Sequence, residues 1–427
     1  MKEKILNVGD KVVLNTKEKD FEGFVLESYD SEIVLLKLNS GYNIGIRENE
    51  ILNVKVIEKA KSEKKKEFSI SQTKGLPNIA MIITGGTISS RLDPKTGGVI
   101  YTDEEEILNI SPELKKICNI IKVEKPFMKW SENMSFADWK VLAETSEKLL
   151  NEDKIEGIII THGTDFLHYS SAALSFFLRD LNKPVAITYS QRSIDRGSTD
   201  ASLNLLCAAK YAASEIAEVA IIGHKDLDDE YCLAMPGTKV RKMHSSRRDT
   251  FKVINDKPIA EISEKEFNIL RVFNAKNKNK VKLDSVYNDK VALVMVYPGQ
   301  DPEILDYYIE KGYKGIILEL SGLGHVPSSE QAKFNWIPKI KKAIDKGIII
   351  CGTAQTIYGR VNPKVYSAGR DLEKTGLIFL KDMLSETAFI KLAWVLGHSK
   401  WAKDKEVVKE KMLENVSGEF NERLGFE

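Results

Sequence analysis

Five short apolar runs separated by polar turn residues open the chain. The runs GDKVVL, GFVLES, EIVLLKL, YNIGIR and ILNVKVI all lie before about residue 58 and are rich in β-branched residues. Short strands at this close spacing, bounded by Gly, Asn, Asp and Ser, are typical of a small, strongly bent antiparallel barrel. We therefore expect a small N-terminal antiparallel β-barrel over residues 1–58.

A lysine-rich segment follows, and it contains few large apolar residues. Its sequence is EKAKSEKKKEFSISQTKGLP. Charge runs of this kind are usually solvated, so we interpret residues 59–76 as a charged linker. The alternative is a strip that contacts phosphate groups.

From residue 77 the pattern changes to continuous apolar runs that alternate with helical stretches. The runs are IAMIIT, GIIITHGT, PVAITYS and VAIIG, and helices are predicted over 136–151, 170–181 and 200–213. Strands that are apolar on both faces and alternate with helices indicate a parallel sheet covered by helices on each side. This pattern predicts a larger α/β domain over 77–270.

A polar stretch then interrupts this alternation before it resumes. EKEFNILRVFNAKNKNKVKLDS predicts an interdomain linker, which we place at 271–289. The runs KVALVMVYPG, GIILELSG, KGIIICGT and TGLIFL follow, with helices between them and at the end. We expect a smaller C-terminal α/β domain over 290–427, so the fold class is α/β, with mainly parallel sheets after the barrel.

Charge and composition argue against a nucleic-acid-binding, disulfide-bonded, metal-binding or membrane-spanning protein. The net charge of the 427 residues is +1, which gives no global field to attract nucleic acid or a membrane. The four cysteines form no CxxC pair and the six histidines are dispersed, so we expect no disulfide framework and no metal. No signal peptide and no apolar run of about 20 residues is visible. A cytoplasmic location is the expectation.

Two strand ends carry unusual chemistry: Thr84-Gly85-Gly86-Thr87 and Thr161-His162-Gly163-Thr164-Asp165. Functional groups of open parallel sheets gather at the carboxyl ends of the strands. Glycine allows a sharp turn and close approach of a ligand, and a hydroxyl is a nucleophile if a base takes its proton. The alternative is an ordinary strand-to-helix turn with threonine caps. Neither stretch matches a P-loop or GxGxxG.

A candidate base lies in the densest basic stretch outside the linkers, TKVRKMHSSRRDTFK, residues 238–252. A lysine drawn into a dry pocket can accept a proton from threonine. The pattern does not say which lysine does so. A solvated loop or a phosphate contact is the alternative.

Together these residues resemble the bacterial-type L-asparaginase family, amidohydrolases with a threonine nucleophile. The motifs TGGTI, residues 84–88, and HGTD, residues 162–165, occur in the family's order, and the resemblance covers roughly residue 78 to the C-terminus. The family's fold, a larger α/β domain joined to a smaller one, agrees with the pattern described above.

The resemblance implies the catalytic residues. Thr87 is the expected nucleophile, and Thr164, Asp165 and Lys242 form a second constellation that activates water. The family's essential lysine lies nine residues before the phenylalanine of DTFK, which selects Lys242, and Lys239 fits this spacing less well. Which threonine attacks first stays open.

The resemblance also implies the substrate-binding residues. Backbone groups of Gly86 and Gly163 should line the site, and Ser131 should bind the substrate carboxylate. Asp165 should hold the substrate ammonium group, with an extra charge from Glu132, where typical asparaginases have glutamine.

Two further departures from the family argue against fast stand-alone asparagine hydrolysis. The loop SRLDPKTGGVIYT lacks the family's tyrosine at its usual spacing, since Tyr101 falls several residues later. His325 stands in place of an asparagine that helps to complete the site of a neighbouring protomer.

The added barrel and the stretch GTKVRKMHSSRRDTF narrow the resemblance to the D subunits of archaeal glutamyl-tRNA(Gln) amidotransferases. A D-type chain of this kind hydrolyses glutamine or asparagine and releases ammonia. Its partner, the E subunit, uses ATP and Mg²⁺ to phosphorylate the glutamyl ester on tRNA, and then transfers the ammonia.

This resemblance also implies an assembly. Homodimers formed through the asparaginase domains would give a D2E2 heterotetramer, and Glu-tRNA(Gln) would be bound mainly by the partner. No cofactor is expected in this chain. The alternatives are a stand-alone L-asparaginase and a tRNA-binding scaffold with an inactive amidase domain. The intact set of Thr87, Thr164, Asp165 and Lys242 argues against the scaffold.

Overall fold

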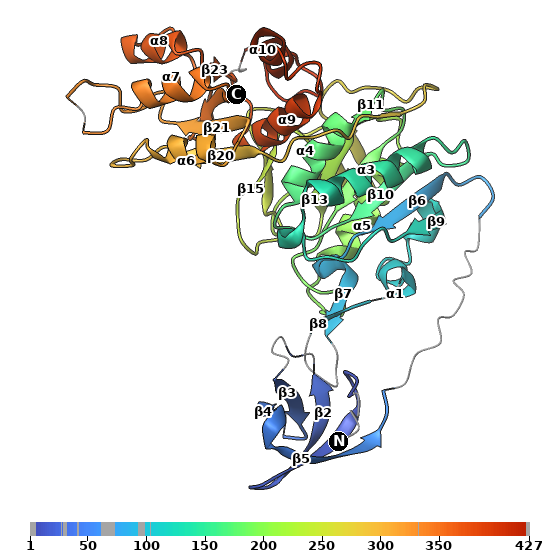
Figure 1. The fold of residues 1–427 in the computed structure, drawn as a ribbon. Helices are drawn as coiled ribbons and strands as arrows, with labels where there is room; N and C mark the ends of the chain where they lie inside the picture. Colours follow the sequence, from blue (N-terminus) through green and yellow to red (C-terminus); the bar gives the residue numbers. More distant parts are fainter. Residues whose placement is uncertain are drawn as a thin grey trace. The chain divides into compact units, whose positions relative to one another are not determined.

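The computed structural model describes residues 6–26, 28, 32–40, 42–60, 73–92, 99–102, 104–331 and 333–423 (Figure 1). The chain divides into two compact units. One unit holds the residues up to 69 together with 90–105, and the other holds 70–89 together with 106–427. Most of the predicted charged linker, 59–76, lies outside the described residues.

The first unit contains the five antiparallel strands that the sequence predicts. They form one sheet in the order β4-β3-β2-β1-β5, and side chains from alternating strand positions pack into its small core. A 3-10 turn, Glu48–Glu50, joins β4 to β5. The strands are β1 Lys11–Thr16, β2 Asp20–Leu26, β3 Ile33–Leu38, β4 Asn43–Arg47 and β5 Ile51–Glu58, and the pair β7 Ser90–Leu92 and β8 Val99–Tyr101 belongs to the same unit.

The second unit begins with an eight-stranded mixed sheet in the order β18-β17-β14-β13-β12-β10-β6-β9. Its five strands from β9 to β13 are parallel, and the remaining three are antiparallel. The strands are β6 Asn78–Ile83, β9 Asn119–Glu124, β10 Gly157–Thr161, β12 Val185–Thr188, β13 Val219–His224, β14 Tyr231–Pro236, β17 Ala260–Ser263 and β18 Phe267–Ile269. The predicted fold class is confirmed.

Helices cover this sheet close to their predicted positions. Helix α3, Phe136–Leu150, begins with a capping box between Ser135 and Asp138. The helix predicted over 170–181 instead ends at residue 177, because the next two residues form β11, which pairs with β19 from far along the chain. The elements are α1 Glu104–Asn109, α2 Leu114–Ile117, α3 Phe136–Leu150, α4 Leu167–Phe177, β11 Leu178–Arg179, α5 Ala201–Ala212 and β19 Lys282–Leu283, and a hairpin of β15 Val240–Lys242 and β16 Phe251–Val253 lies between β14 and β17 in the chain.

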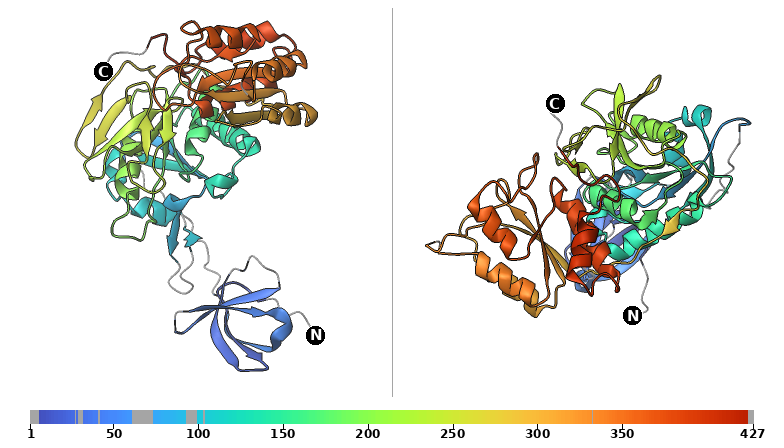
Figure 2. Two further views of the ribbon diagram at one scale, coloured as in Figure 1. Left: turned by 90° about the vertical axis from the view of Figure 1, so that its left-hand side faces the viewer. Right: turned by 90° about the horizontal axis from the view of Figure 1, so that it is seen from above.

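The smaller domain is a four-stranded parallel sheet in sequence order, β20-β21-β22-β23. Figure 2, in which this domain is orange to red, shows its helices on both sides of the sheet. The elements are β20 Val291–Met295, α6 Ile304–Glu310, β21 Gly315–Leu320, α7 Ile337–Asp345, β22 Ile349–Ala354, α8 Ser367–Lys374, β23 Ile378–Phe379, α9 Ser385–Gly397 and α10 Lys405–Leu413.

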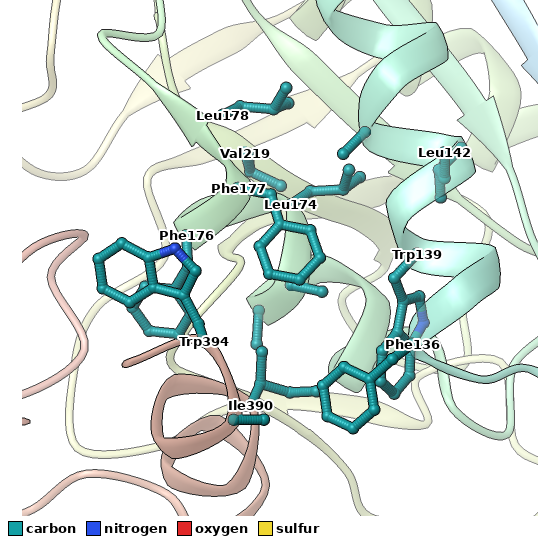
Figure 3. Packing of buried hydrophobic residues seen from close by; sticks show 14 of the residues in the cluster. Phe136, Trp139, Leu142, Leu174, Phe176, Phe177, Leu178, Val219, Ile390 and Trp394 are labelled. Atoms are coloured by element: carbon teal, nitrogen blue, oxygen red, sulfur yellow. The ribbon is translucent and has the colours of Figure 1, made fainter. Parts of the chain in front are cut away.

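One apolar core joins the two α/β domains through α4 and α9. Phe176 of α4 stacks on Trp394 of α9 with ring centroids 5.7 Å apart, and Ile390 of α9 belongs to the same buried cluster (Figure 3). Because protein interiors are close-packed, such a shared core transmits position from one domain to the other.

The predicted interdomain linker, 271–289, is bound to both α/β domains along its length. Asn274 accepts a backbone hydrogen bond from Ala217 at 2.7 Å, and Asp284 donates one to Phe177 at 2.8 Å. Near its end, Asn288 donates to Ala393 of α9 at 2.9 Å.

Over the part of the chain that the structure describes, no helix has the length and apolarity that a membrane span needs.

Candidate active site

The two glycine-containing motifs leave neighbouring parallel strands at the same edge of the sheet. Ile83, at the end of β6, lies opposite Thr161, at the end of β10. Thr84 then donates twice to the Thr161 carbonyl oxygen, from its N–H at 3.2 Å and from its hydroxyl at 2.8 Å. Strand register therefore brings residues 84–88 and 162–165 side by side.

Glycine is required where the two turns touch. Gly85 and Gly86 have φ angles of 109° and 78°, a region that side chains disfavour. A Cβ atom on Gly86 would lie 2.4 Å from the Cα atom of Gly163, and one on Gly163 would lie 2.6 Å from Oγ of Ser131. The two turns are therefore packed too closely for a side chain at either position.

Lys242 joins the second motif to the β15–β16 hairpin. Its Nζ lies 2.9 Å from Oγ1 of Thr164 and 2.7 Å from Oδ1 of Asp165. The lysine side chain is 12% exposed and the Asp165 side chain 55% exposed, so the ion pair sits at the boundary between the interior and solvent. This geometry places an amine within proton-transfer distance of a threonine hydroxyl.

The other candidate lysine, Lys239, is committed elsewhere. It is fully buried, and its Nζ lies 2.5 Å from Oδ2 of the equally buried Asp382 in the smaller domain. The remaining arginines and the last lysine of the basic stretch also have carboxylate partners. Arg241 pairs with Glu386, Arg248 with Asp229, and both Arg247 and Lys252 with Asp249.

Thr87 begins the 3-10 turn Thr87–Ser89 that follows the double glycine. This residue is half-buried, and among the described residues its hydroxyl has no hydrogen-bond partner. Within the same described part of the chain, the peptide N–H groups of Gly163 and Thr164 are also without an acceptor. A carbonyl group bound here would therefore meet a hydroxyl and open N–H donors.

Ser131 lies against the HGTD turn. It begins the 3-10 turn Ser131–Asn133, is buried, and accepts a hydrogen bond at 3.0 Å from the peptide N–H of Asp165. Its own hydroxyl proton can therefore be donated to an anionic group of a ligand. Glu132, the next residue, is exposed and carries its charge beside this position.

His162 is a site residue for which the motifs predict no role. Its buried ring donates from Nδ1 to the Gly163 carbonyl oxygen at 2.6 Å and accepts at Nε2 from the Ser170 hydroxyl at 2.9 Å. Burial lowers the pKa of His162 to about 4, so the ring is neutral near pH 7. Trp139 donates to the same serine oxygen at 2.8 Å. His162 therefore fixes the peptide of the second turn and does not act as a base.

Tyr101 and His325, the two residues discussed above as departures from the asparaginase pattern, lie outside the two glycine-containing turns. Tyr101 ends β8 in the first compact unit. His325 belongs to the smaller domain, where its ring meets that of Tyr366 edge-on at 5.2 Å. In the described residues, His325 makes no hydrogen bond to the residues of the candidate site.

Comparison with known proteins gives a consistent result over the whole chain. Family models match at residues 6–57 (GatD N-terminal domain), 78–273 (Asparaginase, N-terminal) and 290–412 (Glutaminase/Asparaginase C-terminal domain). Among solved structures, the thermostable L-asparaginase from Thermococcus kodakarensis is similar, with a TM-score of 0.71 and 28% identity over 81% of this chain and 100% of that one. L-asparaginase I from Vibrio cholerae has a TM-score of 0.69 at 27% identity, over 81% of this chain and 99% of that one.

Fold and site together define an asparaginase-type protein with an additional N-terminal domain. The D subunit of glutamyl-tRNA(Gln) amidotransferase from Pyrococcus furiosus is 45% identical over 98% of this chain and 96% of its own length. The corresponding D subunit from Methanococcus maripaludis C7 is 41% identical over 99% of this chain and 100% of its own. The chain belongs to this family of D subunits.

Proposed function

We propose that this chain releases ammonia from the side-chain amide of glutamine or asparagine, for the conversion of Glu-tRNA(Gln) to Gln-tRNA(Gln). The chain is the asparaginase-like component of a tRNA-dependent amidotransferase, as its family membership implies. The observation that carries the catalytic proposal is Lys242, held between Thr164 and Asp165 beside the double-glycine turn.

Substrate binding uses the groups around the HGTD turn. The α-carboxylate of the amino acid accepts a hydrogen bond from Ser131, and its ammonium group faces the carboxylates of Asp165 and Glu132. Ser131 is supported in this role because its oxygen already accepts from the Asp165 peptide at 3.0 Å, which leaves its proton for the ligand.

The first half of the reaction is acyl transfer to threonine. The Thr87 hydroxyl attacks the side-chain carbonyl carbon while backbone N–H groups of the glycine turns stabilise the oxyanion. As the C–N bond breaks and the ester forms, the hydroxyl proton ends on the departing nitrogen, which leaves as ammonia. Loss of one oxyanion donor typically lowers the rate by about 10²–10³-fold, so each N–H donor of these turns should contribute a factor of this size to kcat.

The second half of the reaction regenerates the enzyme. Lys242 in its neutral form takes the Thr164 proton, Thr164 takes a proton from water, and the hydroxide so formed attacks the ester on Thr87. As the ester C–O bond breaks, Thr164 gives a proton to the Thr87 oxygen and recovers one from Lys242. The distances of 2.9 Å and 2.7 Å from Nζ to Thr164 and Asp165 support this relay. Acid and free Thr87 are the products.

The proposed complex contains a second kind of chain. Family membership implies an amidotransferase partner. We take this partner to be the E subunit, which would bind ATP, Mg²⁺ and most of the tRNA, in a D2E2 assembly that forms through dimers of the asparaginase domains. A cytoplasmic location is part of this proposal, and it is supported by four buried cysteines that are all free.

A stand-alone L-asparaginase is the second candidate. It is favoured by the likeness of residues 78–412 to asparaginase domains, and by a solved asparaginase that is matched over its full length. Such an enzyme would turn over asparagine quickly without any partner.

Three variants test the catalytic proposal. Thr87→Val should lower kcat for ammonia release by at least about 10⁴-fold, as removal of a covalent nucleophile does.

Lys242→Met should lower kcat by about 10²–10⁴-fold, the usual contribution of a general base. Thr164→Val should slow deacylation, so that peptide mass mapping finds the acyl ester on Thr87.

Thr145→Val is the matched control, because that hydroxyl bonds to the Val141 carbonyl within α3 at 2.9 Å. It should retain normal turnover. An ester found on Thr164 in the Thr87→Val protein would reverse the roles of the two threonines. Normal turnover by Thr87→Val would remove this residue from the mechanism.

A further inference from the structure

The strand that leads to Lys242 is held by the smaller domain at three points. The Thr387 hydroxyl donates to the Thr238 carbonyl oxygen at 2.9 Å. Lys239 and Asp382 form the fully buried ion pair described above, at 2.5 Å. The third contact joins Nε of Arg241 to Oε1 of Glu386 at 3.0 Å. We call these three contacts the hairpin clamp.

The residues that the smaller domain contributes to the clamp lie in helix α9 or just before it. Glu386 and Thr387 lie in the first turn of α9, and Asp382 lies three residues before that helix. The helix is fixed in the shared core through Trp394 and Ile390 (Figure 3). Since α9 cannot shift without disturbing this packing, the clamp gives the β15 strand a fixed reference.

The Arg241–Glu386 contact is the one that bears on the orientation of Lys242. Successive residues of a strand point to opposite faces, so Arg241 and Lys242 leave β15 in opposite directions. Holding the arginine on one face therefore fixes the rotation of the strand about its axis. On the other face, this rotation sets the distance from Nζ of Lys242 to Thr164.

The surroundings of Glu386 leave Arg241 as its cationic partner. The side chain is 8% exposed, and among the described residues the one other basic group within 4 Å of it is Nε2 of His168, at 3.8 Å. Burial lowers the pKa of His168 to about 3, so this ring carries no charge at neutral pH. Loss of the carboxylate charge would thus release the arginine.

We propose that Glu386 is a positioning residue for amide hydrolysis, which acts through Arg241 to keep Lys242 within reach of Thr164. The inference rests on the proposed function, because it assigns to Glu386 a task that matters only if Lys242 takes part in the chemistry. It also gives the smaller domain a direct part in building the site.

Glu386→Gln in the full-length chain, assembled with its partner, is the direct test. The amide keeps the shape of the side chain and removes the charge. A misplacement of about 1 Å can cost 10²-fold in rate, so we expect kcat for ammonia release from glutamine to fall by about 10–100-fold. KM should change less than about threefold, because the clamp touches neither Ser131 nor the glycine turns.

Glu218→Gln is the matched control. Its carboxylate lies 2.7 Å from Nη2 of Arg271, is 13% exposed, and precedes β13, at the edge of the sheet opposite the site. It therefore loses an equivalent ion pair without touching the hairpin, and its kcat should stay within about twofold of the original.

Arg241→Gln provides a second variant in case the Glu386 variant does not fold. The arginine side chain is 31% exposed, so a glutamine in its place keeps contact with solvent, while Glu386 loses its cationic partner. We expect the same fall in kcat at nearly constant KM, and no further fall in the double variant, because the two residues act as one unit. Multiplicative losses in the double variant, or a normal kcat in either single variant, would overturn the positioning role.

Lys242→Met, prepared and assayed in the same way, separates this inference from the proposed function. An inactive Lys242→Met protein beside a normal Glu386→Gln protein would refute the clamp and leave the catalytic proposal standing. A fully active Lys242→Met protein would refute the catalytic proposal itself.

Discussion

Two threonine hydroxyls face the candidate site, and they differ in what surrounds them. Thr164 is hydrogen-bonded to Nζ of Lys242, whereas Thr87 stands free of partners among the described residues. A hydroxyl bound to an amine is prepared for proton transfer, and a hydroxyl without a partner can approach a carbonyl. This contrast is why we assign the attack to Thr87 and the relay to Thr164.

Two buried histidines border the site, and their burial has a consequence for stability. The pKa of His162 is lowered to about 4 and that of His168 to about 3, in both cases mainly by burial. In the unfolded chain both rings titrate near their ordinary value. As the pH falls through that value, the unfolded chain takes up protons that the folded chain cannot, so the folded state loses stability.

His168→Leu isolates one of these contributions. For a histidine whose pKa falls from about 6.5 to about 3, stability is fully present above pH 6.5, and about 2 kcal/mol of it is lost between pH 7 and pH 5. Nδ1 of His168 has no partner in the described residues, so leucine removes no hydrogen bond there. The variant should therefore lose less stability on acidification.

Urea unfolding at the two pH values measures this difference. The original protein, unfolded in urea at the same two pH values, provides the control. An unchanged pH dependence in His168→Leu would show that the ring titrates normally in the folded state.

The roles of individual residues could be predicted only where a motif carries them. TGGTI and HGTD led to Thr87, Thr164 and Asp165, and the spacing to Phe251 selected Lys242 over Lys239. His162 and Glu386 could not be found in this way. Their importance comes from contacts that no motif encodes, such as the bond from Ser170 to His162 and the pairing of Glu386 with the distant Arg241.

At the scale of elements, the site depends on two turns that touch through backbone alone. Gly86 follows β6 and Gly163 follows β10, and the register of these parallel strands places the turns at the same level. In the described part of the chain, the peptide N–H groups of Gly163 and Thr164 have no acceptor, and such donors are what an oxyanion requires.

Gly86→Ala should therefore abolish ammonia release. The new methyl group would lie 2.4 Å from the Gly163 backbone, and residue 86 has a φ of 78°, so one turn must move away from the other. Thermal unfolding and an ammonia assay check the result. We expect a stability loss of more than about 1 kcal/mol together with loss of activity, since backbone strain alone costs about 1–3 kcal/mol.

Gly75→Ala is the control for backbone strain. Gly75 also has a positive φ, 92°, but a Cβ atom there would meet no atom of the described residues within 4 Å apart from its own chain neighbours. Its alanine variant should lose about 1 kcal/mol and keep its turnover. Equal activity in the two variants would mean that the contact between the turns does not shape the site.

The elements themselves follow the apolar pattern closely. The predicted helices 136–151 and 200–213 appear as Phe136–Leu150 and Ala201–Ala212, because apolar periodicity indicates both and a capping box marks the start of the first. The prediction is wrong at the end of α4, where pairing of β11 with β19 replaces the last helical turn. That partner strand lies in the segment that the sequence predicts as a linker, and no local signal reveals such a pairing.

At the scale of the whole molecule, the chain combines an N-terminal five-stranded unit with two α/β domains that share a core. The smaller domain does more than complete the fold, because its α9 helix and the residues just before it hold the hairpin that carries Lys242. The curated relatives that match over nearly the whole chain are components of a tRNA-dependent amidotransferase. An amidase built into such a complex should be active mainly when the acceptor is present.

Ammonia release from glutamine and from asparagine tests this account most directly. The purified chain would be assayed alone, then with the E subunit, ATP and Glu-tRNA(Gln), with Lys242→Met as the blank. We predict weak release by the chain alone and a sharp rise only when the partner and the charged tRNA are both present. Rapid asparagine hydrolysis by the chain alone, unchanged by either addition, would contradict the account and identify a stand-alone asparaginase.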